Sequence, residues 1–221
     1  MFLQIIGSGT CVPSLKRGSP ATYIKIGQTQ ILVDIGPGTL RQLERAGISY
    51  QEINIVCITH YHADHISDLV PFIQALKWNP NFLRTKELLL IGPPGFNTFY
   101  QTLCVPISGN PLPDTFTIAI KEIQNSLVFA NFSIQSYKTN HTPDSIAYKF
   151  LESGNSLVIS GDTDFDNGLI GFSQNSDLLV LECSFDNLHK KKGHLIPKEC
   201  AEIAQKAQVK KLLLNHLYPA I

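Results

Sequence analysis

Short apolar runs recur along the whole chain, and several are closely followed by histidine, aspartate or glutamate. Their lengths and their content of leucine and β-branched residues are typical of buried strands. The clearest of these runs are residues 53–58, 157–161, 178–181 and 211–214, and the alternating residues 134–138 predict one more strand.

Helix-like spacing of apolar positions separates some of these runs. It predicts helices over residues 39–46, 66–78 and 197–207, and Pro197 suits the first turn of the last one. Residues 92–114 contain five prolines and three glycines, which predicts an irregular connection with a short helix around residues 96–103. The chain therefore has two β-rich portions, each interrupted by helices, which fits two sheets packed face to face with helices outside.

The seven residues from Thr59 to His65 contain three histidines and an aspartate, directly after the apolar run 53–58. An ordinary loop has no reason to collect these side chains, whereas a divalent cation needs several nitrogen and oxygen donors at about 2 Å. The predicted strand would place them at its carboxyl end, where open α/β sheets have their sites. We therefore expect metal ligands in this loop.

Three further donors, each at the end of a strand-like run, extend the set. They are His141, Asp162 and His216. A single histidine or aspartate after a strand is more often a turn residue or a cap. Together with the loop, however, they give five histidines and two aspartates, a number that suits two metal ions sharing one carboxylate.

The pattern His60-x-His62-x-Asp64-His65, with the later donors, resembles the metallo-β-lactamase superfamily. The resemblance implies an α/β fold, a four-layer αββα sandwich, as a single hydrolase domain over residues 1–221. Relatives usually continue through another helix and strand, so the chain would be either truncated or a minimal variant. By the same resemblance, one ion would be held by His60, His62 and His141, the other by Asp64, His65 and His216, with Asp162 bridging them.

Glu182 and His194 look like the acidic residue and the catalytic histidine of the ribonuclease Z group and related phosphodiesterases. A carboxylate bonded to one imidazole nitrogen fixes the tautomer and favours the protonated ring. That ring could protonate a leaving alkoxide or stabilise charge on phosphorus. The alternative is a surface charge at a strand end and a polar residue beside a helix. The candidate catalytic residues are thus Asp64, His194 and Glu182.

One segment departs from the ribonuclease Z pattern. In the tRNA-processing enzymes a long tRNA-gripping arm lies between the positions that match His141 and Asp162, but only 20 residues separate them here. Residues 147–159 instead predict a hairpin that turns at 152–155. The closer likeness is therefore to short-form, arm-less hydrolases acting on small or nucleotide phosphodiesters, with RNA as a weaker candidate.

Charge and cysteine content restrict the setting. Lys and Arg total 18, as do Asp and Glu, so the chain has no general attraction for nucleic acid. The one dense basic patch, residues 189–192, is either a solvated loop or a phosphate contact. Five scattered cysteines, no apolar stretch of membrane-spanning length and no signal-peptide pattern predict a cytoplasmic protein without a membrane partner. A homodimer is compatible with the sequence.

These observations predict a dinuclear metal-dependent hydrolase, most simply a phosphodiesterase. Two divalent ions are expected, with zinc favoured by the histidine and aspartate donors, and manganese or iron as alternatives. The rival hypotheses are lactone or thioester hydrolysis, tRNA 3′-processing without the arm, and a metal-binding scaffold without turnover. A complete set of seven ligands disfavours the scaffold, because a non-catalytic protein does not need one.

Overall fold

The computed structural model describes residues 1–104, 106 and 114–219, and within them the strands form two six-stranded sheets. The strands of the first sheet lie in sequence order and are β1 (Phe2–Gly7), β2 (Ala21–Ile26), β3 (Thr29–Val33), β4 (Ile55–Cys57), β5 (Leu88–Gly92) and β6 (Ile118–Glu122). Those of the second run in the reverse spatial order from β12 to β7 and are β7 (Ser126–Val128), β8 (Ser133–Lys138), β9 (Ile146–Glu152), β10 (Asn155–Ile159), β11 (Leu178–Glu182) and β12 (Leu212–Asn215).

Each sheet is antiparallel in one half and parallel in the other. Strands β3 to β6 run parallel to one another, and so do β10, β11 and β12. Strands β9 and β10 form the predicted antiparallel hairpin, in which Glu152 pairs with Asn155. Because parallel strands end at the same edge of a sheet, loops that are distant in sequence meet there.

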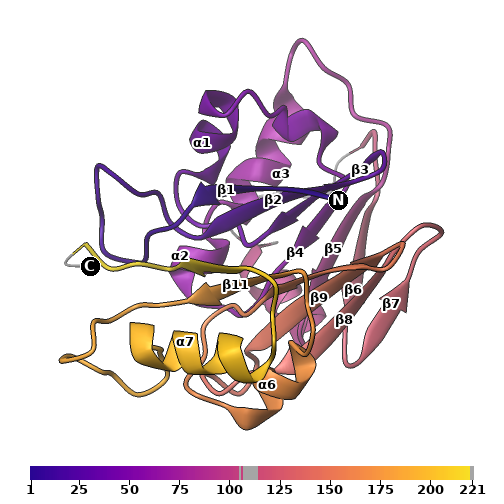
Figure 1. Cartoon of the computed structure of the whole chain (residues 1–221). Helices are drawn as coiled ribbons and strands as arrows, with labels where there is room; N and C mark the ends of the chain where they lie inside the picture. The colour runs from indigo at the N-terminus through magenta and orange to yellow at the C-terminus, as the bar shows by residue number, and fades with distance from the viewer. Residues whose placement is uncertain (105, 107–113, 220–221) are drawn as a thin grey trace.

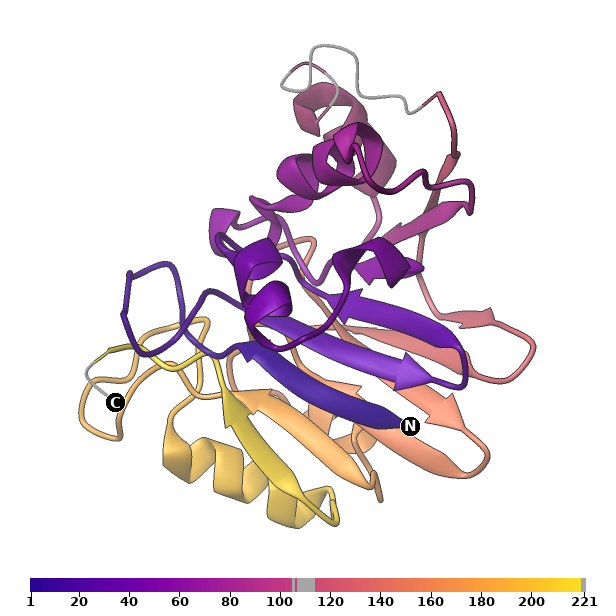
Figure 2. The ribbon, with the colours of Figure 1, turned by 90° about the horizontal axis from the view of Figure 1, so that it is seen from above.

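Helices cover the outer faces of both sheets (Figures 1 and 2). Helices α1 and α3 lie on the first sheet, and α6 and α7 lie on the second. The helical segments are α1 (Thr39–Arg45), the 3-10 turn η1 (Tyr50–Glu52), α2 (Ala63–Ile66), α3 (Leu69–Trp78), α4 (Phe96–Phe99), the π-helical η2 (Tyr100–Cys104), α6 (Asn167–Phe172) and α7 (Pro197–Lys206).

These helices include all the expected ones, but α6 and the short η1 were not predicted from the sequence. The helix predicted over 66–78 is divided into α2 and α3 by Ser67 and Asp68. The short helix expected around 96–103 is present as α4 and η2, and Pro197 opens α7. Part of the expected irregular connection, residues 105 and 107–113, lies outside the described residues.

Alternation along the strands divides the buried side chains into three cores. On β3, Ile31 and Val33 face the second sheet, whereas Leu32 packs under the helices of the first sheet. On β10, Leu157 again faces the other sheet, and Val158 packs under α6 and α7. The period of two in strands produces this sorting. Three cores separate four layers, so the expected αββα sandwich is confirmed.

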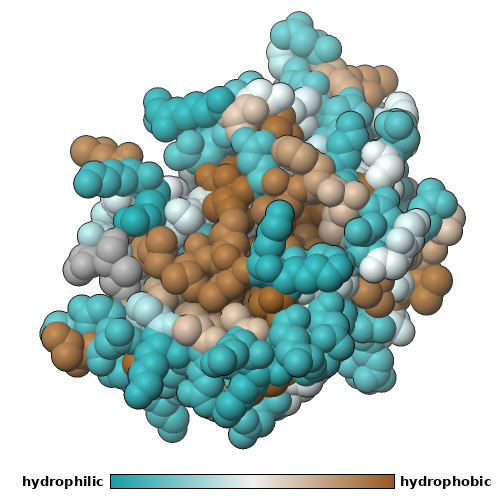
Figure 3. Space-filling view, in the orientation of Figure 1, coloured by the Kyte–Doolittle hydropathy of each residue, from teal (hydrophilic) through white to brown (hydrophobic). Residues whose placement is uncertain are grey.

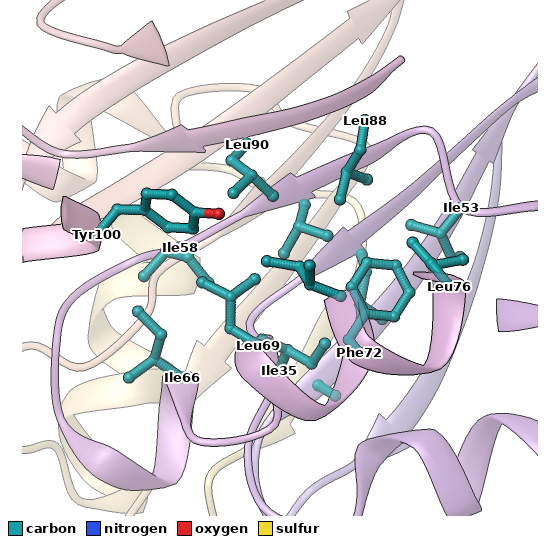
Figure 4. Packing of buried hydrophobic residues seen from close by; sticks show 14 of the residues in the cluster. Ile35, Ile53, Ile58, Ile66, Leu69, Phe72, Leu76, Leu88, Leu90 and Tyr100 are labelled. Carbon is teal, nitrogen blue, oxygen red and sulfur yellow. The ribbon is translucent and has the colours of Figure 1, made fainter. Parts of the chain in front are cut away.

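Helix α3 shows how one helix closes an outer core. Leu69, Phe72, Ile73 and Leu76 recur at helical spacing and are all buried. Figure 4 shows Phe72 and Leu76 against the side chains of Leu88 and Ile53. This packing fixes α3, and with it the preceding loop and α2, against the end of the first sheet.

The two edge strands β1 and β12 lie on the same side of the sandwich (Figures 1 and 2). They carry partly exposed apolar side chains, among them Phe2, Leu212 and Leu214. Apolar surface gathers at the centre of this face (Figure 3). Among the described residues, no helix has the length and apolar character needed to cross a membrane.

Candidate metal centre

All seven predicted ligands lie in segments that follow strands, at one end of the sandwich, with Asp64 and His65 in the short helix α2. The loop after β4 enters α2 at Ala63, and its backbone packs against Gly36: a Cβ there would lie 1.9 Å from the carbonyl oxygen of Asp64. The amide of Ile35 also donates to the carbonyl of His65 at 2.8 Å. Only glycine permits so close an approach, so the turn after β3 holds the histidine loop in place.

The seven side chains converge into two groups. Within each group the nitrogen and oxygen atoms able to bind a metal lie within 4.8 Å of one another. One group consists of His60, His62, His141 and Asp162, and the other of Asp64, His65 and His216. The structure thus brings together all seven metal ligands that the sequence indicated, from four separate segments of the chain.

Asp162 lies between the two groups and turns one carboxylate oxygen to each. Its Oδ2 is 3.8 Å from His60 Nε2 and 3.7 Å from His141 Nε2. Its Oδ1 is 3.4 Å from Nε2 of both His65 and His216. A carboxylate in this position can contribute one oxygen to each of two neighbouring cations.

The imidazole nitrogens face one another at the separations expected of ligands to a common ion. His65 Nε2 lies 3.2 Å from His216 Nε2, and His141 Nε2 lies 3.2 Å from His62 Nδ1. Two nitrogens bound tetrahedrally at 2.0–2.1 Å would be roughly 3.3 Å apart. Two metal-binding lone pairs that point at the same spot therefore explain the contacts better than hydrogen bonds do.

Hydrogen bonds to the other ring nitrogen fix the orientation of four of these histidines. The Nδ1 atoms of His65 and His141 donate to Asp34 Oδ2 and to the Gly193 carbonyl, both at 2.8 Å. That of His216 donates to Ser184 Oγ at 2.8 Å, and that of His60 donates to Thr59 Oγ1 at 3.0 Å. In each case the proton is held on Nδ1, and Nε2 keeps its lone pair for a metal.

Asp34 connects two of these rings. Its Oδ1 accepts the amide of Thr59 at 2.8 Å, and its Oδ2 accepts the Thr59 hydroxyl at 2.9 Å in addition to His65. The Thr59 hydroxyl in turn accepts from His60. One buried carboxylate therefore orients a histidine of each group.

The pair formed by Glu182 and His194 lies beside the two groups. His194 Nδ1 donates to Glu182 Oε1 at 2.9 Å and lies 3.8 Å from Asp162 Oδ2. Glu182 is 2% exposed and also accepts from Ser184 and from the amides of Thr163 and Leu195. The surface-charge alternative for Glu182 is therefore wrong, because the carboxylate is buried and fully hydrogen-bonded.

The electrostatics suit cation binding. Burial lowers the pKa of His60 well below its ordinary value, and neighbouring histidines add to the effect, which favours the neutral, metal-binding form. Burial acts against ionisation of Asp162, but the imidazoles around it outweigh that effect and hold its pKa well below the usual range. Burial also opposes charge on His194, yet the hydrogen bond and charge of Glu182 raise its pKa.

The backbone is strained at two positions of the centre. Asp34 and His216 adopt φ angles of 61° and 54°, a region that non-glycine residues seldom occupy. Gly161, at φ 58°, makes the turn that presents Asp162, and a Cβ there would lie 2.8 Å from that of Thr59. Such conformations cluster at functional sites, where the surrounding contacts enforce them.

Two buried atoms point to divalent ions directly. His60 Nε2 and Asp162 Oδ1 make no hydrogen bond with any residue that the structure describes. Buried polar atoms are almost always paired, so an unpaired nitrogen and oxygen in one cluster require another partner. Histidine and carboxylate donors at these separations fit divalent metal ions.

Several residues around the centre are not recognisable from the motif. Asp34 stands as a lone charge in an apolar run, which is the one signal that could have indicated it. Ser184 and Gly193 carry no such signal, since their role depends on contacts with His216 and His141, distant in sequence. Not every residue of the basic patch 189–192 is available to bind a phosphate, because Lys190 forms ion pairs with Asp164 and Glu199.

Replacing Asp34 with asparagine should weaken metal binding roughly 10- to 100-fold, the usual effect of losing such a partner. The new amide oxygen can still accept from Thr59, but the amide NH₂ would then face His65 Nδ1 and favour the tautomer with its proton on Nε2. Titration with a competing chelator would measure the change. The exposed Asp186→Asn variant is the control, and equal affinities in both variants would contradict the orienting role.

Comparison with known proteins agrees with this geometry. Ribonuclease Z of Pyrococcus horikoshii is 29% identical over 97% of this chain and 85% of its own length. The metallo-β-lactamase fold protein YhfI of Bacillus subtilis superposes with a TM-score of 0.86 at 26% identity, over 98% of this chain and 86% of that one. The short form of human tRNase Z superposes with a TM-score of 0.85 over 99% of this chain and 93% of its own. At 23% identity, this likeness supports the fold but not a shared function.

A family model described as "Anti-Pycsar protein Apyc1" matches residues 1–220. The match spans both sheets and every residue of the candidate centre. The chain therefore belongs to the anti-Pycsar protein Apyc1 family, within the ribonuclease Z-like, short-form part of the metallo-β-lactamase superfamily.

Proposed function

We propose that the chain is a dinuclear metal-dependent phosphodiesterase that acts on a small or nucleotide phosphodiester. The position of Asp162, with one oxygen turned to each group of histidines, carries the proposal of two ions. Curated relatives named Ribonuclease Z support phosphodiester chemistry in a hydrolase of this group. The donor set favours zinc.

The two groups of ligands would hold one metal ion each. His60, His62 and His141 would hold one ion, Asp64, His65 and His216 the other, and Asp162 both. When bound, the ions would supply a nucleophile at neutral pH and neutralise charge on the phosphoryl oxygens. Asp64 Oδ2 lies 3.4 Å from His216 Nε2, and this carboxylate would add negative charge to the second ligand group and help to orient the attacking water.

His194 would act on the leaving group. Glu182 occupies its Nδ1 and stabilises the protonated ring, so Nε2 is the atom that can give a proton to the departing oxygen. Glu182 contacts no reacting atom in this scheme and is a positioning residue. The pair supports phosphodiester over acyl chemistry, because lactone or thioester hydrolysis needs the metals but not this acid.

Two features favour a small substrate over a whole tRNA. The segment between His141 and Asp162 consists of β9, β10 and a tight turn at Ser153 and Gly154, which leaves no room for an arm. A cavity of about 440 Å³ opens beside Asp64, lined by residues of the loop after β1 and by Gln42. This volume lies within the range of small-molecule sites, roughly 300–1,000 Å³.

We expect close to two divalent ions per chain in fully loaded protein, and Asp162→Ala should loosen both because each loses an oxygen ligand. Metal analysis after dialysis against a weak chelator would measure the content. Asp186→Ala, which removes an exposed carboxylate, should keep both ions. Full retention of two ions by Asp162→Ala would rule out the bridging role.

Small phosphodiesters, such as a nitrophenyl or cyclic nucleotide ester, should be hydrolysed with higher kcat/KM than precursor tRNA is cleaved. The physical reasons are the missing arm and the zero net charge of the chain. Both activities can be compared in one metal-loaded preparation. Accurate and more efficient 3′-end cleavage of precursor tRNA by the protein alone would support the processing enzyme instead.

His194→Ala should lower turnover roughly 10²–10⁴-fold without changing metal content, the usual range for a positioned acid. The loss should be larger for alkoxide leaving groups than for nitrophenolate, which needs little protonation. His189→Ala on the same loop is the matched control, since its side chain is 71% exposed and, among the described residues, its ring bonds only to Asp186. Unchanged turnover of every phosphodiester by His194→Ala would remove the argument for phosphodiester chemistry.

A further inference from the structure

The loop between β11 and α7 serves the candidate centre twice. It carries His194, and its Gly193 carbonyl accepts from His141 Nδ1 at 2.8 Å. Gly193 has φ 87°, and a Cβ there would lie 3.1 Å from that ring nitrogen. The position of this one peptide therefore affects a predicted metal ligand and the predicted acid together, although the loop belongs to no helix or strand.

Lys190 joins the parts that surround this loop. Its ammonium group donates to Asp164 Oδ1 and to the His194 carbonyl, both at 2.6 Å, and to Glu199 Oε2 at 2.5 Å. The lysine side chain is 31% exposed, and those of Asp164 and Glu199 are 18% and 22% exposed. Three oxygen atoms from three segments thus share one half-buried cation.

Asp164 and Glu199 each also accept a backbone amide, and these contacts connect the ion pairs of Lys190 to the loop and to α7. Asp164 Oδ2 accepts the Gly193 amide at 2.8 Å, and the Asp164 amide donates to the Asn140 carbonyl, next to His141. Glu199 Oε2 accepts the amide of Ile196 at 3.2 Å, at the start of α7. The ammonium group therefore lies where the loop, the segment after Asp162 and the first turn of α7 meet.

We propose that Lys190 is a positioning residue, which holds the backbone of His194 and, through Asp164, the Gly193 carbonyl in the places where the acid and His141 can work. The inference rests on the proposed function for the role of His194, and on the observed contacts for the role of Lys190. A lysine with three oxygen partners is not available to bind a substrate phosphate.

Lys190 stays positively charged. Burial alone would lower its pKa, but the hydrogen bonds with Asp164 and Glu199 outweigh burial and raise its pKa. Single exposed ion pairs contribute little to stability, but networks with good geometry are the exception. Lysine suits this site because its compact ammonium has three donors that can turn to separate oxygens, whereas arginine offers a flat fork.

The test compares Lys190→Met with Lys192→Met in the metal-loaded protein. Lys192 lies on the same loop, is exposed, and carries the same charge. We expect Lys190→Met to lower kcat roughly 10- to 100-fold for a phosphodiester with an alkoxide leaving group, as losses of such supporting contacts do. The loss should be smaller for a nitrophenyl ester, KM should stay the same, and Lys192→Met should match the parent protein.

A double-mutant cycle separates positioning from general weakening of the fold. At saturating zinc, where the contact of Gly193 with His141 does not limit metal content, Lys190→Met in a His194→Ala background should cause little further loss of kcat on the alkoxide substrate, because both changes then remove the same contribution. Additive losses, or equal losses for good and poor leaving groups, would overturn the proposal. Thermal unfolding of each variant checks folding, and Lys190→Arg, which keeps the charge, should restore part of the activity.

A readout without turnover keeps this proposal distinct from the proposed function. In zinc-loaded protein, the NMR signals of the His194 ring and the Gly193 amide should shift in Lys190→Met and stay unchanged in Lys192→Met. Unmoved signals in Lys190→Met would refute the positioning role, whatever the activity. Shifted signals with normal turnover of all phosphodiesters would instead keep the positioning role and refute the role of His194 as the acid.

Discussion

A carboxylate buried among five imidazoles is the constraint to which the rest of the structure responds. Asp162 is 3% exposed, and burying an unpaired charge costs several kcal/mol. Four of the imidazoles turn Nδ1 to another partner, so the ring nitrogens nearest Asp162 are the ones that can bind a metal. Cations between the two groups are the arrangement that satisfies the carboxylate and the lone pairs together.

The sequence predicted what depends on neighbours along the chain. Strand periodicity gave the two sheets, and the ligands were visible because each follows a strand-like run, as His60 follows β4 and Asp162 follows β10. The layers were inferred from two β-rich portions interrupted by helices and from the resemblance to the superfamily, and the structure shows how neighbours such as Leu32 and Val33 face different cores. The break between α2 and α3 was not predicted, since the apolar spacing continues across it.

What could not be predicted depends on residues that meet only in the fold. Ser184 accepts from His216 and donates to Glu182, and so links a ligand of one group to the carboxylate that holds His194. The spacing of these residues in the sequence does not predict that contact. In the sequence, Lys190 likewise could not be distinguished from the two lysines that follow it, because only the fold brings Asp164 and Glu199 to it.

Each group of ligands draws on both sheets. His60 and His62 follow β4 of the first sheet, whereas His141 and Asp162 belong to the second, and the same division separates His65 from His216, 151 positions further along the chain. Each ion would therefore tie the two halves of the sandwich together at this end. Because binding to the folded form alone stabilises it by mass action, free ion concentration would set how firmly the sheets are joined. Metal scarcity would then lower the activity of the protein and also shorten its lifetime, because a sandwich that opens at one end exposes its core to proteases.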